Sequence, residues 1–155
     1  MPHVATSQQT QRELTVLFVG SPSADLQEAC DSERTRPVNI EVATDGRAAI
    51  QRLVAASESP TKYSQPDLVL LRCDFELPDG MTVLHAIKSS PRLRATPVVV
   101  LDPDDTNIEQ TYRAGGNAHV STPETTEEYV DLVRSITRFW FGWAQYPAES
   151  LYSDT

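Results

Sequence analysis

Five short runs along the chain have the apolar pattern of β-strands, and polar segments separate them. The runs cover 14–19, 38–42, 68–71, 98–101 and 117–121. The runs at 14–19, 68–71 and 98–101 are continuous, which is typical of strands buried on both faces of a parallel sheet. The run at 38–42 alternates apolar and polar residues, so we expect a half-exposed edge strand there. The run at 117–121 predicts a brief last strand.

Between these runs, apolar residues recur every three or four positions and predict five helices. They are expected at 23–33, from 44 onward, at 81–90, from 105 to Gly115-Gly116, and from 125 onward. Gly115-Gly116 is a typical helix end, and Thr125 with Glu128 forms a capping box. The residues expected to face the sheet are Ala49, Ile50, Leu53 and Val54 in the second helix, Val83, Leu84 and Ile87 in the third, and Tyr129, Leu132, Val133, Ile136 and Trp140 in the last.

Strands that alternate with helices predict an α/β fold with a parallel sheet and helices on both faces. A flavodoxin-like, doubly wound sheet of five strands in the order 2-1-3-4-5 fits, with the amphipathic second strand at the edge. The domain is expected over 13–141. Residues 1–12 are expected to form a disordered lead-in, and 142–155 a C-terminal tail.

The net charge of −9 and the pI near 4.7 argue against a nucleic-acid surface. No apolar run approaches the ~20 residues of a membrane span, and 1–12 lacks the apolar core of a signal peptide, so a cytoplasmic protein is expected. Cys30 and Cys73 lack metal-ligand spacing and are expected as reduced thiols.

Eleven arginines accompany only Lys62 and Lys88. This bias indicates either a salt-adapted, halophilic source such as a haloarchaeon or compositional drift toward arginine.

A set of motifs in a fixed order carries a resemblance to a known family. The motifs are Asp67–Leu71, Asp79-Gly80, Thr96–Leu101, Ala114–Ala118 and Thr122-Pro123. With them the chain resembles the receiver domain of two-component response regulators, the CheY-like superfamily, in its stand-alone form. The resemblance covers about 14–141. It implies a module of phosphorelay signal transduction.

The resemblance also implies a phosphorylation site, and this chain departs from it. Receivers use two acidic residues to bind Mg²⁺, an aspartate nucleophile, a hydroxyl residue and a lysine, with an aromatic switch residue on the last strand. The matching positions here are Gly20 and Ser21, Arg72, Asp102, Thr122 and, for the switch, His119. A packing role for His119 is the alternative to a switch. We therefore expect a degenerate pseudo-receiver that binds no metal or other cofactor.

The position of the acceptor aspartate admits two alignments. In the family it lies eight residues before the glycine of Asp79-Gly80 and five after the aspartate that opens the strand, and both spacings give Arg72. The rival alignment matches Asp74 through the step to Pro78, and that reading would make Asp74 a phosphoacceptor with Mg²⁺. With Arg72 at the strand end, an ion pair between Arg72 and Asp102 is a further hypothesis.

The expected function is that of a non-enzymatic signalling module acting by protein–protein interaction. The expected partner is a histidine kinase or a downstream effector, or a second copy of the chain, with no role for nucleic acid or membrane. By resemblance, the surface would be the fourth helix, the fifth strand and the last helix. Trp140, Phe141 and Trp143 are interface candidates, with core packing as the alternative. A regulator phosphorylated at Asp74 and, below it, a small-ligand sensor are the alternative functions.

Overall fold

Five parallel strands form the centre of the molecule. The computed structural model describes residues 14–21, 38–58, 65–72, 79–103 and 107–142. The strands are β1 (Leu14–Val19), β2 (Val38–Ala43), β3 (Leu68–Arg72), β4 (Val98–Asp102) and β5 (Ala118–Ser121). They are ordered β2-β1-β3-β4-β5, so the predicted flavodoxin-like topology is confirmed.

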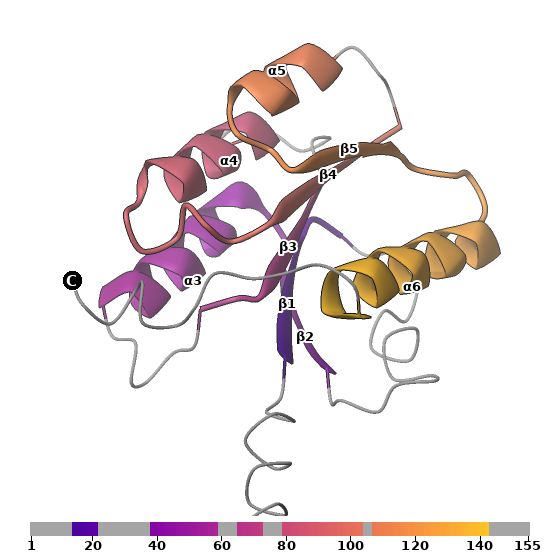
Figure 1. Cartoon of the computed structure of the whole chain (residues 1–155), viewed down its shortest axis with the longest axis horizontal. Coiled ribbons are helices and arrows are strands. Elements are labelled where there is room, and N and C mark those ends of the chain that lie inside the picture. The colour runs from indigo at the N-terminus through magenta and orange to yellow at the C-terminus, as the bar shows by residue number, and fades with distance from the viewer. Residues whose placement is uncertain (1–13, 22–37, 59–64, 73–78, 104–106, 143–155) are drawn as a thin grey trace, which may run out of the picture.

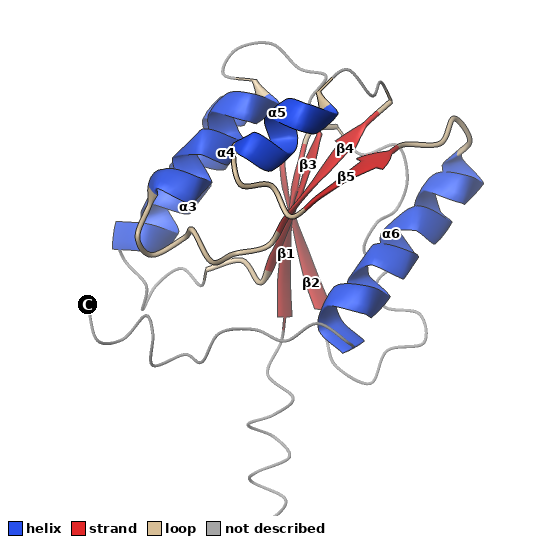
Figure 2. Ribbon diagram, turned by 45° about the horizontal axis from the view of Figure 1, so that its top comes forward, coloured by secondary structure: helices blue, strands red, loops and turns tan. Residues whose placement is uncertain are grey.

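Helices cover both faces of this sheet. They are α3 (Gly46–Glu58), α4 (Gly80–Ser89), α5 (Ile108–Arg113) and α6 (Thr126–Gly142). Helices α3, α4 and α5 lie on one face, and α6 lies on the other (Figures 1 and 2). Among the helices that the structure describes, none is both long and apolar enough to cross a membrane.

The core is divided by the sheet into two apolar clusters. Successive strand residues point to opposite faces, so each strand contributes to both clusters. On the α6 side lie Val16, Phe18, Leu68, Leu70, Val99 and Leu101 with Tyr129, Val133 and Ile136. On the other side lie Leu17, Val19, Val69, Leu71, Val98 and Val100 with Ala49, Leu53, Val83, Leu84 and Ile87. Each fully buried leucine or valine stabilises the fold by about 1.5–3 kcal/mol.

The predicted start of α6 and the predicted end of α5 are confirmed, and α4 begins with a cap that was not predicted. The Asp79 carboxylate accepts from the Thr82 amide at 3.0 Å and caps α4. The Glu128 amide donates to Thr125 Oγ1 at 3.2 Å at the start of α6. After α5, Gly115 has a φ of +95°, a conformation that favours glycine. Local sequence signals therefore set where these helices begin and end.

One inward-facing residue was predicted wrongly, and several predictions lie outside the described residues. Val54 is 45% exposed, because α3 packs through Gly46, Ala49, Leu53 and Ala56, a stripe of smaller residues that turns Val54 outward. The predictions outside the described residues are the lead-in 1–12, the helix at 23–33, Cys30, Cys73, Asp74, Trp143 and the rest of the tail from 143 on.

Candidate functional site

The positions that match the receiver site gather at the carboxyl edge of the sheet. Gly20 and Ser21 follow β1, Arg72 is the last residue of β3, and Asp102 is the last residue of β4. Thr122 follows β5, and its amide donates to the Asp102 carbonyl at 3.2 Å. Open α/β folds place their binding sites along this edge. The fold therefore brings together the five positions that the sequence singled out.

Arg72 lies directly over the end of β1. Its Nη1 donates to the Ser21 carbonyl at 3.0 Å. A Cβ added to Gly20 would lie 2.9 Å from Arg72 Cδ and 3.0 Å from Arg72 Cβ, and Gly20 has a φ of +124°. Only glycine accommodates both this φ and this close approach. The position of the Arg72 side chain thus depends on glycine at position 20.

Arg72 brings a positive charge to the ends of β1 and β3, where it would repel a divalent cation. Mg²⁺ is held by carboxylate, carbonyl and water oxygens. Here a guanidinium lies on the Ser21 carbonyl, and neither Gly20 nor Ser21 supplies a carboxylate. Within the described ranges, no three acidic, histidine or cysteine side chains gather as a metal-binding group.

Asp102 and His119 form a second, buried part of the site. Their side chains are 6% and 1% exposed, and His119 Nε2 lies 3.8 Å from Asp102 Oδ2. Asn107 Nδ2 donates to the same carboxylate oxygen at 3.1 Å. The other ring nitrogen, His119 Nδ1, lies 2.9 Å from Thr111 Oγ1. The sequence pointed to Asp102 and His119 separately, but it gave no signal for Thr111 or Asn107, which reach them from α5 and its cap.

The hypothesised ion pair between Arg72 and Asp102 is not present. Arg72 lies opposite Leu101 in the sheet, so Asp102 is one residue further along β4. By strand alternation, Arg72 shares the face of Leu70, toward α6, whereas Asp102 shares the face of Val100. The carboxylate instead meets His119 and Asn107, and the guanidinium meets Ser21. Neighbouring strand ends therefore do not imply contact between their side chains.

The aromatic residues near the chain end divide into core and surface. Trp140 and Phe141 are half-buried and pack against the cluster under α6. Phe139 is 52% exposed, with its ring edge-to-face on Trp140 at 5.2 Å. Phe139 is therefore a surface aromatic that the sequence reasoning did not single out, and its spacing of three from Ile136 gave no sign of its exposure.

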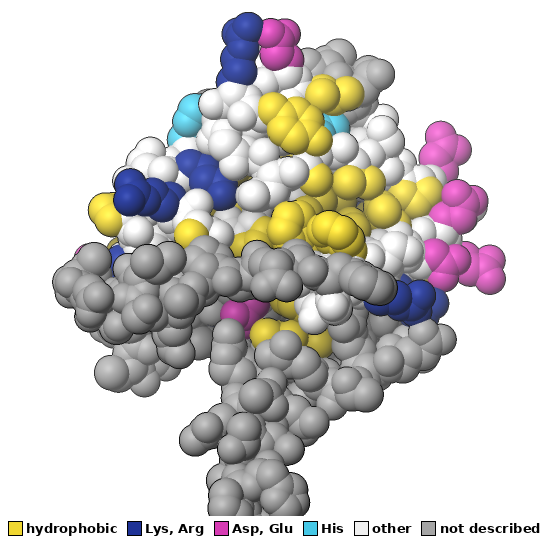
Figure 3. Space-filling view, in the orientation of Figure 1, with side chains coloured by type: hydrophobic (Ala, Val, Ile, Leu, Met, Phe, Trp, Pro, Cys, Tyr) yellow, Lys and Arg dark blue, Asp and Glu magenta, His cyan; other side chains and the backbone are white. Residues whose placement is uncertain are grey.

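An apolar surface continues from α6 to α5. On α5, Tyr112 is 52% and Ile108 is 41% exposed. Figure 3 shows hydrophobic side chains spread over α5 and across β5 toward α6, while acidic side chains gather at the outer end of α6. We refer to Ile108, Tyr112 and Phe139, with the surface of β5 between them, as the α5–β5–α6 face. Exposed aromatic residues of this kind are enriched at protein interfaces.

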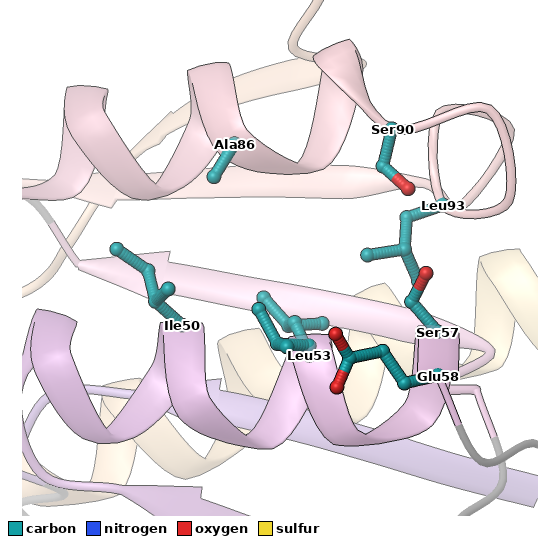
Figure 4. A pocket seen from close by; sticks show the side chains of 8 residues that line it. Ile50, Leu53, Ser57, Glu58, Ala86, Ser90 and Leu93 are labelled. Atoms are coloured by element: carbon teal, nitrogen blue, oxygen red, sulfur yellow. The ribbon is translucent and has the colours of Figure 1, made fainter.

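A shallow pocket of about 220 Å³ lies between α3 and α4. Its lining includes Ile50, Leu53 and Leu93, with Ser57, Ser90 and the Glu58 carboxylate at one end (Figure 4). These polar groups come from the carboxyl ends of the helices, at the edge of the sheet away from Arg72. The pocket is therefore separate from the candidate site.

Comparisons with known proteins agree with this architecture. No protein-family model matches the chain. The chain is 38% identical over 112 residues to the probable methanogenesis regulatory protein FilR2 of Methanothrix harundinacea, across 70% of each chain. It is 27% identical over 137 residues to the response regulator Rcp1 of Synechocystis, across 86% of this chain and 92% of Rcp1.

A solved structure extends the likeness to the fold. The phosphorylated cyanobacterial phytochrome response regulator RcpA has a TM-score of 0.78 at 29% identity, over 88% of this chain and 99% of RcpA. The sheet order, the motifs along the carboxyl edge and these relatives agree. The chain belongs to the response regulator receiver family, the CheY-like domains.

Proposed function

We propose that this chain is a receiver-like module that acts by protein–protein interaction and is not switched by phosphorylation. The observation that carries the proposal is the position of Arg72, the last residue of β3, with its guanidinium over the end of β1 on the Ser21 carbonyl. An arginine occupies the place from which receivers present their nucleophile, and it extends over the place of their acidic pair.

Phosphoryl chemistry requires groups that these positions lack. The guanidinium carries only donors and remains protonated, so Arg72 cannot attack phosphorus. Its positive charge over Gly20 and Ser21 opposes a divalent cation, and the Thr122 hydroxyl cannot supply the charge of a lysine. RcpA was solved phosphorylated and Rcp1 with Mn²⁺ bound. For this chain we propose neither a metal nor a catalytic role.

The α5–β5–α6 face is the proposed contact surface. Ile108, Tyr112 and Phe139 together expose apolar area on two helices that flank one edge of the sheet. Burial of such side chains against a partner releases about 25 cal/mol per Å² of apolar surface before the costs of association. The proposed partner is a signalling protein, a histidine kinase or a downstream effector, or a second copy of this chain.

Incubation with acetyl phosphate and Mg²⁺, followed by intact mass measurement, tests the loss of phosphorylation. We expect no phosphoryl adduct on this chain, and RcpA serves as the positive control because it has been solved phosphorylated. An adduct that is lost in Asp74→Asn would establish the alternative, a regulator that uses Asp74. The same experiment thus decides between the two functions.

The contact surface is tested separately by light scattering at low and high salt. If the partner is a second copy, Phe139→Ser should weaken self-association. Val42→Ser is the matched control, because Val42 is similarly exposed but lies on β2, at the opposite edge of the sheet. Equal effects of the two substitutions would exclude the α5–β5–α6 face as the site of self-association.

A further inference from the structure

The pocket between α3 and α4 is apolar over most of its lining. Leu53 of α3 and Leu93, which follows α4, are buried, and Ile50 is half-buried. Val54, which is 45% exposed, lines the pocket too. The volume of about 220 Å³ exceeds that of an apolar cavity of about 150 Å³ that holds benzene. One ring with a short chain would therefore fill this space.

The polar end of the pocket carries negative charge. The Glu58 carboxylate points back along α3 toward Leu53, and the hydroxyls of Ser57 and Ser90 lie at the same end (Figure 4). Among the described residues that line the pocket, only Glu58 has a charged side chain. Binding sites combine an apolar lining with a few polar groups that fix the orientation of the ligand. A positive group attached to an apolar group would match both parts of this pocket.

The ends of the two helices favour a cation at the same place. The carboxyl end of a helix has a partial negative charge, which basic residues in the last turn usually offset. The last turn of α3 contains no basic residue, and the helix ends on Glu58. In the last turn of α4, Lys88 donates to the carbonyl oxygens of Arg94 and Thr96, and it does not line the pocket. A cation at the polar end would thus be attracted by the carboxylate and by the end of α3.

The described basic residues nearest in the chain do not occupy the polar end. Arg52 of α3 pairs with Glu41 of β2 at 2.6 Å. Arg92 follows α4 between two lining residues but is not itself part of the lining. Lys62 lies outside the described residues, so its influence on Glu58 is a matter for experiment.

We propose that this pocket binds a small organic cation, with its ammonium group on Glu58 and its apolar group against Leu53 and Leu93. An ammonium group has three donors, and the Glu58 carboxylate with the Ser57 and Ser90 hydroxyls offers matching acceptors. The inference goes beyond the proposed function, because the pocket shares no residue with the candidate site or with the α5–β5–α6 face.

Titration of the full-length chain with phenethylammonium, followed by NMR of the backbone amides, tests the site. This probe joins one ring to a primary ammonium, which stays protonated at about pH 7. At low ionic strength we expect saturable shifts at Ser57, Glu58, Ser90 and Leu93, with a Kd of about 1–10 mM. Phenethyl alcohol, which has the same shape without the charge, should bind about three- to tenfold more weakly. Phenylacetate, an anion, should not bind.

Three variants locate the contacts. Glu58→Gln should weaken phenethylammonium about three- to tenfold and leave phenethyl alcohol unchanged. Glu127→Gln is the matched control, because it changes the net charge equally at an exposed position of α6 and should leave both affinities unchanged. Ala86→Leu should weaken both probes, because Ala86 lines the pocket from α4 and a larger side chain would fill it. Leucine is a good helix former, so this variant should fold, and circular dichroism checks that it does.

Four results would overturn the inference. The absence of saturable shifts at the lining residues would exclude the pocket as a binding site. Equal affinities for phenethylammonium and phenethyl alcohol would exclude recognition of the charge. Equal effects of Glu58→Gln and Glu127→Gln would assign binding to the net charge of −9. A clear gain in affinity for phenethylammonium in Lys62→Met would show that the chain's own lysine occupies the polar end. None of these results bears on phosphorylation or on the α5–β5–α6 face, so the proposals fail independently.

Discussion

Substitution of Gly20 by alanine tests the position of Arg72, on which the proposed function depends. Alanine at a φ of +124° costs about 1–3 kcal/mol in backbone strain. Its new Cβ would lie 2.9 Å from Arg72 Cδ and 3.0 Å from Arg72 Cβ. The Cδ can move aside, but the Cβ is fixed to the strand, so overpacking adds about 1–3 kcal/mol. We expect a total loss of about 2–6 kcal/mol in the free energy of unfolding.

A double-mutant cycle with Arg72→Ala separates strain from crowding. The substitution removes Cγ and Cδ but keeps Cβ, so it should recover about 0.5–1.5 kcal/mol of the Gly20→Ala loss. Urea unfolding measures the free energy of unfolding of each single variant and of the double variant. Gly142→Ala is the matched control, because a Cβ there meets nothing within 4 Å, and this substitution should be neutral or stabilising. A Gly20→Ala loss below about 0.5 kcal/mol, or no coupling to Arg72, would refute the placement of Arg72 over β1.

Substitutions at three further residues test individual side-chain contacts, and urea unfolding measures the change in stability for each. Lys88→Met should cost about 1–3 kcal/mol, since three oxygens lose their ammonium donor. Burial lowers the Lys88 pKa below 10.5, so wild type should gain stability relative to Lys88→Met as the pH rises toward 10.5, and a falling difference would contradict this. Asp67→Ala should cost about 1–3 kcal/mol by orphaning the Thr15 amide, and Asp67→Asn less. In Gly116→Ala, the new Cβ would lie 2.6 Å from Thr111 Cγ2, so the substitution should cost about 1–3 kcal/mol in the free energy of unfolding. A neutral result would argue against that packing.

Local sequence signals predicted the elements well where they act within a few residues. The cap of α6 was readable because the Thr125 hydroxyl satisfies the free amide of Glu128, three residues further along. The strands β3 and β4 were readable because both faces are covered and the runs are continuous. The exposure of Val54 was not readable, because a helix turns according to what it packs against, and α3 packs through small residues.

In the candidate site, too, the sequence predicted the positions of residues along the chain but not the contacts of their side chains. Spacing along the chain placed Arg72 at the end of β3, and the structure has it there. Spacing could not predict whether the side chains of Arg72 and Asp102 lie on the same face of the sheet. That depends on the register between β3 and β4. The partners of His119 come from α5, and no local pattern marks Thr111 as the residue that meets the ring.

The sequence by itself determined the topology, the family and the identity of the residues at the carboxyl edge. These follow from periodicity, turns and motif order, which are properties of neighbouring residues. Only the tertiary structure decided that Arg72 lies on Ser21 over Gly20, and that Asp102 meets His119 and not Arg72. The physical reason is that strand register and pleat direct each side chain to one face, and these are fixed by contacts between segments far apart in the chain.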